Sequence, residues 1–160
     1  MKKSIFFFVF LIAVSTSLIA QQNNKTFDRK NAVYLEIGGS AVWYSLNYEY
    51  RIPFQINQRL ALSGGLSVIP VDNSNFIGTI SANYLIGYKN IFELGISPAY
   101  IFTNSELLMS ARIGYRYESD KGFLFRAGFS PVYGQFILAG SEDGTKGILP
   151  WGYISFGYAF

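Results

Sequence analysis

Apolar and polar side chains alternate with a period of two through most of this chain, in eight segments separated by residues that favour turns. The segments span residues 33–39, 42–52, 60–69, 76–87, 91–102, 107–117, 123–134 and 151–160. Most of them match the roughly 9 to 11 residues that a tilted strand needs to cross a bilayer. The pattern therefore predicts an all-β fold with eight strands.

One face of each segment is apolar and carries no charged residue, as in Leu46, Tyr48 and Tyr50. The opposite face holds small and polar residues: Glu36, Ser45, Asn47, Glu49, Arg51, Ser63, Ser67, Thr79, Ser81, Asn83, Glu93, Ser97, Ser110, Arg112, Arg116, Arg126, Ser130 and Ser155. A soluble sandwich or lipocalin would turn the apolar face inward, and periodicity alone does not separate the two arrangements. An Arg or Lys facing lipid at mid-depth costs about 2 to 4 kcal/mol, so a charge-free face favours the membrane.

We therefore predict an eight-stranded antiparallel transmembrane up-and-down β-barrel with both termini in the periplasm, because an even strand count returns the chain to its starting side. The periplasmic turns are predicted at 53–58, 88–90 and 118–122. The outer loops are predicted at 38–41, 70–75, 103–106 and 135–150. The longest connection thus lies on the outer side, as expected for such barrels.

The N-terminal residues 1–20 have the features of a signal peptide. Lys2 and Lys3 precede an apolar stretch at 5–14, and small residues lead to Ala20. Residues 21–31 are polar and aperiodic, which predicts a flexible periplasmic lead-in. The barrel itself is predicted to occupy residues 32–160.

The last strand places Phe156, Tyr158 and Phe160 on one face. A chain that ends on such a strand is typical of a substrate of the outer-membrane barrel assembly machinery. We therefore expect that machinery and the outer-membrane lipids as partners, the bacterial outer membrane as the location, and a monomer as the assembly state. The abundance of tyrosine agrees, because aromatic girdles lie at bilayer interfaces.

Charge gives no support to nucleic-acid binding. Of 13 basic residues two belong to the predicted signal peptide, which leaves 11 against 10 acidic residues and a net charge of +1. A nucleic-acid-binding domain needs a clustered basic face. We expect no nucleic-acid partner.

Four blocks of the sequence resemble a family of small outer-membrane barrel proteins from Bacteroidota that has no assigned function. The blocks are 30–52, 83–97, 112–131 and 150–160, of which 30–52 and 112–131 are the most specific. The resemblance covers nearly the whole chain after the signal peptide. It implies the eight-stranded barrel and the outer-membrane location, and it implies no activity.

The charged residues of the polar face predict a filled lumen. If the hairpin around Lys121 is symmetric, Arg116 and Arg126 face each other and repel unless carboxylates lie between them. An eight-stranded barrel is just wide enough for its own side chains, so inward charges must pair. We predict one ionic network in the periplasmic half of the lumen, with Arg112 about one layer higher: Glu36, Glu49, Glu93, Arg112, Arg116 and Arg126.

The chain contains no histidine and no cysteine. Serine-histidine hydrolases, acyl-chain enzymes with a histidine base and histidine or cysteine metal sites are thereby excluded. We predict no catalytic residues, no metal site and no cofactor. The network is interpreted as a filling that rigidifies the barrel, with a gate or narrow ion path and a catalytic carboxylate pair as alternatives.

The expected function is that of a non-enzymatic integral outer-membrane barrel, with a structural role or a surface-interaction role through residues 135–150. The alternative is a narrow channel or a carrier for a small solute or ion. A lipid-modifying enzyme is a third hypothesis, which the missing histidine weakens. The residues identify no surface ligand.

Overall fold

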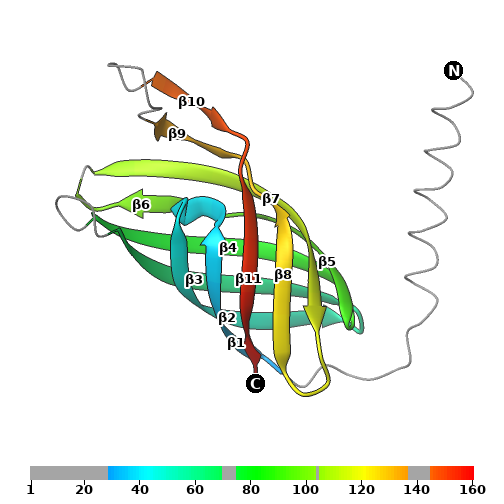
Figure 1. Ribbon diagram of the computed structural model, residues 1–160. Helices are drawn as coiled ribbons and strands as arrows, with labels where there is room; N and C mark the ends of the chain where they lie inside the picture. The colour runs from blue at the N-terminus through cyan, green and yellow to red at the C-terminus, as the bar shows by residue number, and fades with distance from the viewer. Residues whose placement is uncertain (1–28, 70–74, 104, 137–144) are drawn as a thin grey trace, which may run out of the picture.

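The computed structural model describes residues 29–69, 75–103, 105–136 and 145–160, which form a closed eight-stranded antiparallel β-barrel (Figure 1). The predicted fold is confirmed in this respect. The predicted signal peptide 1–20 and most of the predicted lead-in 21–31 lie outside the described residues, as do most of the loop at 70–75 and the centre of the loop at 135–150. No helix in the described part of the chain has the length and apolar composition of a membrane span.

The elements follow the predicted segments closely, with differences at their ends. The first half of the chain forms β1 (Asn31–Gly38), the 3-10 helix η1 (Gly39–Ala41), β2 (Tyr44–Gln55), β3 (Gln58–Ile69) and β4 (Asn75–Gly87). The second half forms β5 (Asn90–Ile96), β6 (Ala99–Ile101), β7 (Glu106–Glu118), β8 (Phe123–Phe129), β9 (Val132–Phe136), β10 (Thr145–Leu149) and β11 (Gly152–Ala159).

Prolines interrupt three of the eight barrel strands. Pro98 separates β5 from β6, Pro131 separates β8 from β9, and Pro150 separates β10 from β11. Proline has no N–H to donate to the ladder, so regular pairing stops there. The register nevertheless continues across each break, since Ile96 pairs with Ala111 and Ala99 with Leu108. Each pair of short strands therefore acts as one strand of the barrel.

The barrel closes through its first and last strands. β1 and β11 are antiparallel, with Val33 opposite Tyr158 and Ile37 opposite Ile154. At the ends of the chain Asn31 N–H donates to Phe160 O at 3.0 Å, and Phe160 N–H donates to Asn31 O at 2.8 Å. We call this end of the barrel the terminal end and the opposite one the far end. β11 also pairs with β8, and β8 with β7, which completes the circle.

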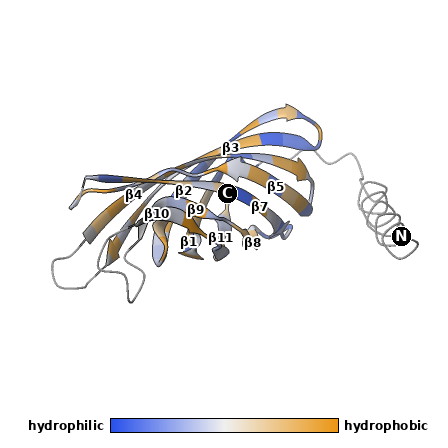
Figure 2. Ribbon diagram, turned by 90° about the horizontal axis from the view of Figure 1, so that it is seen from above, coloured by the Kyte–Doolittle hydropathy of each residue, from blue (hydrophilic) through white to orange (hydrophobic). Residues whose placement is uncertain are grey.

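The two predicted faces are confirmed. All polar residues assigned to the inner face are buried, whereas most of the large apolar residues of the other face are exposed. Figure 2 shows the resulting alternation of hydrophilic and hydrophobic residues along the strands. In β1 to β9 and β11, every charged residue except Glu106, the first of β7, is buried. The exposed outer face, here named the apolar belt, includes Leu46, Tyr48, Leu66, Ile80, Leu94, Ile113 and Phe156.

The connection between β1 and β2 does not project as the loop predicted at 38–41. Gly39, Ser40 and Ala41 form η1 and are all buried, because the connection folds into the far end of the barrel. Ser40 Oγ lies 2.8 Å from Ser97 Oγ on the opposite wall. Ala41 packs in an apolar group, the far-end cluster, with Ile77, Ala99, Leu108 and Val132. The backbone of this connection therefore lies inside the barrel, at its far end.

Both ends of the loop predicted at 135–150 are strand instead, since β9 runs to Phe136 and β10 covers Thr145–Leu149, whereas residues 137–144 lie outside the described part of the chain. β10 pairs with β9 from Leu149 opposite Val132 to Thr145 opposite Phe136, and the same register continues into β8 and β11. Among the described strands β10 has a partner only on the β9 side, because β1 ends at Gly38.

Candidate functional site

The main group of charged side chains in the described residues is a buried Arg/Glu network inside the barrel. Strand alternation turns the charged side chains of β1, β2, β3, β5, β7 and β8 into the lumen. All six predicted residues are buried and take part in ion pairs, and three further residues join them. The complete network consists of Glu36, Glu49, Arg51, Arg59, Glu93, Arg112, Arg116, Glu118 and Arg126.

Glu93 of β5 holds the centre of the network. Arg116 and Arg126 face each other across the β7–β8 hairpin, in the register predicted from its symmetry. Glu93 Oε2 accepts from Arg116 Nε at 3.0 Å and from Arg126 Nε at 3.1 Å, and Glu93 Oε1 accepts from Arg126 Nη2. One carboxylate thus lies between two guanidinium groups and offsets their repulsion.

Arg116 also reaches across the lumen to β2. Its Nη1 and Nη2 donate to the two carboxylate oxygens of Glu49 at 2.6 and 2.8 Å, in a two-pronged geometry that favours strong, directional pairing. Glu49 in turn accepts from Arg51 Nε at 2.8 Å. These contacts join opposite walls of the barrel.

Toward the terminal end the network includes residues that the sequence pattern did not assign to it. Glu118 accepts from Arg51 Nη1 at 2.9 Å and lies 3.8 Å from Arg59 Nη1. Glu118 was predicted to begin a turn, and Arg59 was placed before its strand. Both keep the inward parity of their strands, so extending each segment by one residue identifies them.

Toward the far end Glu36 forms the next layer with Arg112, which donates to Glu36 Oε1. Ser155 Oγ donates to Glu36 Oε2 at 3.2 Å, and Arg126 Nη1 lies 3.7 Å from the same oxygen. Arg112 therefore belongs to the same network. Glu36 connects it to the central cluster.

Two buried tyrosines complete the packing around Arg126. The Arg126 guanidinium lies 4.3 Å from the ring centre of Tyr34 and 5.5 Å from that of Tyr153. Arg112 lies 4.7 Å from the Tyr153 ring. Cation–π contacts of desolvated guanidinium groups are worth about 2 kcal/mol. Neither tyrosine stands out in the alternating pattern, although both have the inward parity of their strands.

Glycines provide the space for these rings, which gives a testable prediction. A Cβ at Gly128 would lie 2.8 Å from Tyr153 Cε1 and 2.4 Å from Ile113 O. We expect Gly128→Ala to lower the free energy of unfolding by about 1 to 3 kcal/mol through overpacking, measured by denaturant titration. Gly64→Ala is the control, because a Cβ there meets only Thr79 O at 3.9 Å, and its effect should stay within about 0.5 kcal/mol. Equal stability of the two variants would contradict this packing.

The charged residues of the network are shielded from solvent inside the barrel, each at most 3% exposed. The far-end cluster covers one side, and two apolar groups lie beside the network near the terminal end. These groups consist of Ala32, Tyr34, Leu124 and Ala159, and of Ala61, Leu85 and Ile91. Among the described residues the buried charges are five arginines and four glutamates, a surplus of one positive charge.

Charges outside the lumen behave differently. Lys89 Nζ donates to Asp120 Oδ2 at 2.5 Å, and this hydrogen bond raises the pKa of Lys89. The two side chains are 43% and 62% exposed, so the pair is a surface contact between neighbouring turns. The predicted assembly residues Phe156, Tyr158 and Phe160 are also exposed, on the apolar belt.

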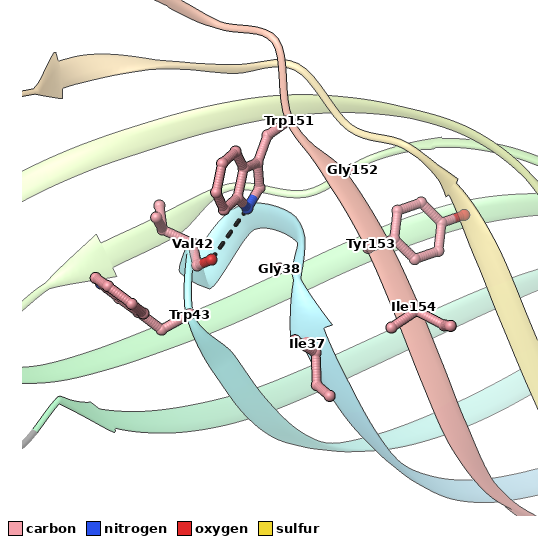
Figure 3. A pocket seen from close by; sticks show the side chains of 8 residues that line it. All are labelled: Ile37, Gly38, Val42, Trp43, Trp151, Gly152, Tyr153 and Ile154. Atoms are coloured by element: carbon pink, nitrogen blue, oxygen red, sulfur yellow. Dashed lines mark hydrogen bonds between the residues drawn. The ribbon is translucent and has the colours of Figure 1, made fainter.

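A concave feature, here named the rim groove, lies in the outer wall where the β1–β2 connection meets the start of β11 (Figure 3). Its volume is about 350 Å³, and its lining consists of Ile37, Gly38, Val42, Trp43, Trp151, Gly152, Tyr153 and Ile154. Trp151 Nε1 donates to Val42 O at 3.0 Å, so the indole joins β11 to the β1–β2 connection. The sequence pattern did not indicate this groove, because its walls come from opposite ends of the chain.

The backbone beside the groove is strained. Val42 has φ of 69° and ψ of −48°, and Trp43 N–H donates to Ala41 O at 2.8 Å, which defines a γ-turn with positive φ. Such a conformation is costly for a β-branched residue. Strained residues persist where the surrounding structure imposes them, and they concentrate at binding sites.

Comparison of the chain with protein-family models, with curated proteins and with solved structures finds no match. The functional argument therefore depends on the barrel, its network and its groove.

Proposed function

We propose that the chain is an integral outer-membrane β-barrel with a closed lumen and no enzymatic activity, acting in a structural or surface-interaction role. The observation that carries this proposal is the inversion of a soluble protein's polarity, with charges buried inside and large apolar side chains exposed all round. In water, such a belt is far larger than the apolar patches that soluble monomers expose. The belt fits the hydrocarbon of a bilayer, and the resemblance to small Bacteroidota barrels agrees with this location.

The geometry of the network supports a filling role rather than a catalytic one. Each of its four glutamates is paired with at least one arginine. Such pairs hold the carboxylates and guanidinium groups in fixed, directional contacts that join the strands across the lumen. Surface interaction would fall to the β9–β10 hairpin, which extends beyond the end of β1.

The alternative function, a narrow channel, requires an ion to pass the far-end cluster and the network. An ion that leaves water for a lumen filled with side chains loses its hydration without a replacement, which is strongly unfavourable. The surplus positive charge predicts that any current through this lumen would select anions.

Conductance across planar lipid bilayers tests the closed lumen. We expect no single-channel openings from the refolded protein, under conditions in which a general porin opens normally. Anion-selective openings would contradict the closed lumen and support the channel.

Cell fractionation with heat-modified gel migration tests the location. The folded form is expected in the outer-membrane fraction, and recovery in the soluble fraction would overturn the proposal.

A further inference from the structure

We propose that the rim groove binds one acyl chain of a membrane lipid, taken from the leaflet at the far end of the barrel. This inference rests on the proposed insertion of the apolar belt into a bilayer. It adds a specific lipid site to a surface that otherwise meets lipid only through general contact.

The lining of the groove matches a hydrocarbon ligand. None of its residues is charged, and one of its few polar groups, the Trp151 indole N–H, already donates to Val42 O. Ile37 and Ile154 form the side nearest the belt, and both are exposed, at 52% and 37%. The groove is therefore continuous with the belt, and a chain lying in it continues along the seam between β1 and β11, past Leu35 and Phe156.

The position of the two tryptophans agrees with the depth of a lipid chain. Trp43 and Trp151 line the groove, in the connections before β2 and β11 respectively. Tryptophan favours the interface between headgroups and hydrocarbon. The groove thus begins at the expected interface and extends toward the middle of the belt.

The size of the groove favours a single chain over a protein. Its volume of about 350 Å³ falls within the range of small-molecule sites, roughly 300 to 1,000 Å³. A stable protein partner buries about 800 Å² on each side, which eight lining residues do not supply.

The groove is also preformed. A Cβ at Gly38 would lie 2.3 Å from Gly152 O, so two backbones approach closely and form its floor. The strained turn at Val42 and its hydrogen bond from Trp151 hold the opposite wall. A rigid site loses little conformational freedom on binding, which favours affinity.

Fluorescence quenching by brominated lipid tests the proposal, because the two tryptophans that line the groove are the only ones in the chain. The full chain after the predicted signal is refolded into phosphatidylcholine vesicles that contain increasing fractions of a lipid with brominated acyl chains. We expect saturable quenching at low fractions of brominated lipid. Simple contact with surrounding lipid would instead give quenching proportional to the fraction.

Gly152→Leu is designed to fill the groove. The position faces outward, and its nearest contact for a Cβ is Gly128 O at 3.2 Å. Excluding about two methylene groups of the bound chain should raise the fraction needed for half-maximal quenching about tenfold. Gly64→Leu is the matched control on the belt, with Thr79 O at 3.9 Å, and should behave like the unmodified protein.

The outcomes separate this inference from the proposed function. If the unmodified protein floats with the vesicles but all three quenching curves coincide, the site is overturned and the membrane barrel stands. If the unmodified protein does not float with the vesicles, both the lipid site and the proposed membrane barrel are overturned. If Gly152→Leu fails to fold, Ile37→Phe fills the groove from the other wall and must give the same shift. If the protein instead forms dimers and the quenching by brominated lipid disappears in the dimer, the groove is covered by a second copy of the chain and the lipid site is overturned.

Discussion

Glu93→Ala is expected to lower the free energy of unfolding by about 3 to 5 kcal/mol, because it removes one partner of a buried ionic group. Arg116 would keep its two hydrogen bonds to Glu49. Among the described carboxylates Arg126 would retain only Glu36, at 3.7 Å from its Nη1, and would become a poorly compensated buried charge. Denaturant titration in lipid vesicles, together with heat-modified gel migration, measures the loss.

Two further variants show whether the effect comes from buried charge. Asp120→Ala removes a carboxylate from the exposed pair with Lys89 and should cost no more than about 1 kcal/mol. Glu93→Ala combined with Arg126→Met removes the stranded charge and should regain part of the stability lost by the single variant. A Glu93→Ala protein as stable as the Asp120→Ala protein would contradict the network.

Ile80→Arg is expected to destabilise the protein in a bilayer by about 2 to 4 kcal/mol, because it places a charge at mid-depth on the lipid side. Ile80 lies near the middle of β4, opposite Gly64, and is 69% exposed. In water, the same substitution at so exposed a position would be nearly neutral. Reversible unfolding from lipid vesicles measures the difference.

Phe76→Arg is the control on the same strand. Phe76 is exposed near the end of β4, where an arginine reaches the interface and costs about 0 to 1 kcal/mol. A dependence on depth is therefore the expected signature of membrane insertion. Equal, small effects of Ile80→Arg and Phe76→Arg would contradict the proposed location of the belt.

Several boundaries were missed because local sequence patterns are weakest at the ends of elements. Glu118 and Arg59 have the inward parity of their strands, yet each lies one residue outside its predicted segment. Pro98 and Pro131 interrupt strands that the pattern treated as continuous. The residues at 145–149 show little alternation by themselves and become a strand through pairing with β9.

The inward turn of η1 and the rim groove depend on contacts between distant parts of the chain. Ser40 meets Ser97, and the indole of Trp151 bonds to Val42 O. No local pattern encodes such contacts, because the close approach of β1 to β11 arises only when the barrel closes. The same holds for the enclosure of Arg126 between Tyr34 and Tyr153.

The alternation of side chains along the chain is enough to predict the number of barrel strands, their antiparallel order and the face on which each side chain lies, because the period of two is a local property of a strand. It also indicated that Arg116 and Arg126 would need a carboxylate between them, since one hairpin relates their positions. The pairing of each glutamate with its arginines, the inward fold of the β1–β2 connection and the position of the groove become visible only in the folded barrel. Those features depend on the stagger between strands around the whole barrel, which is set by closure and not by any single segment.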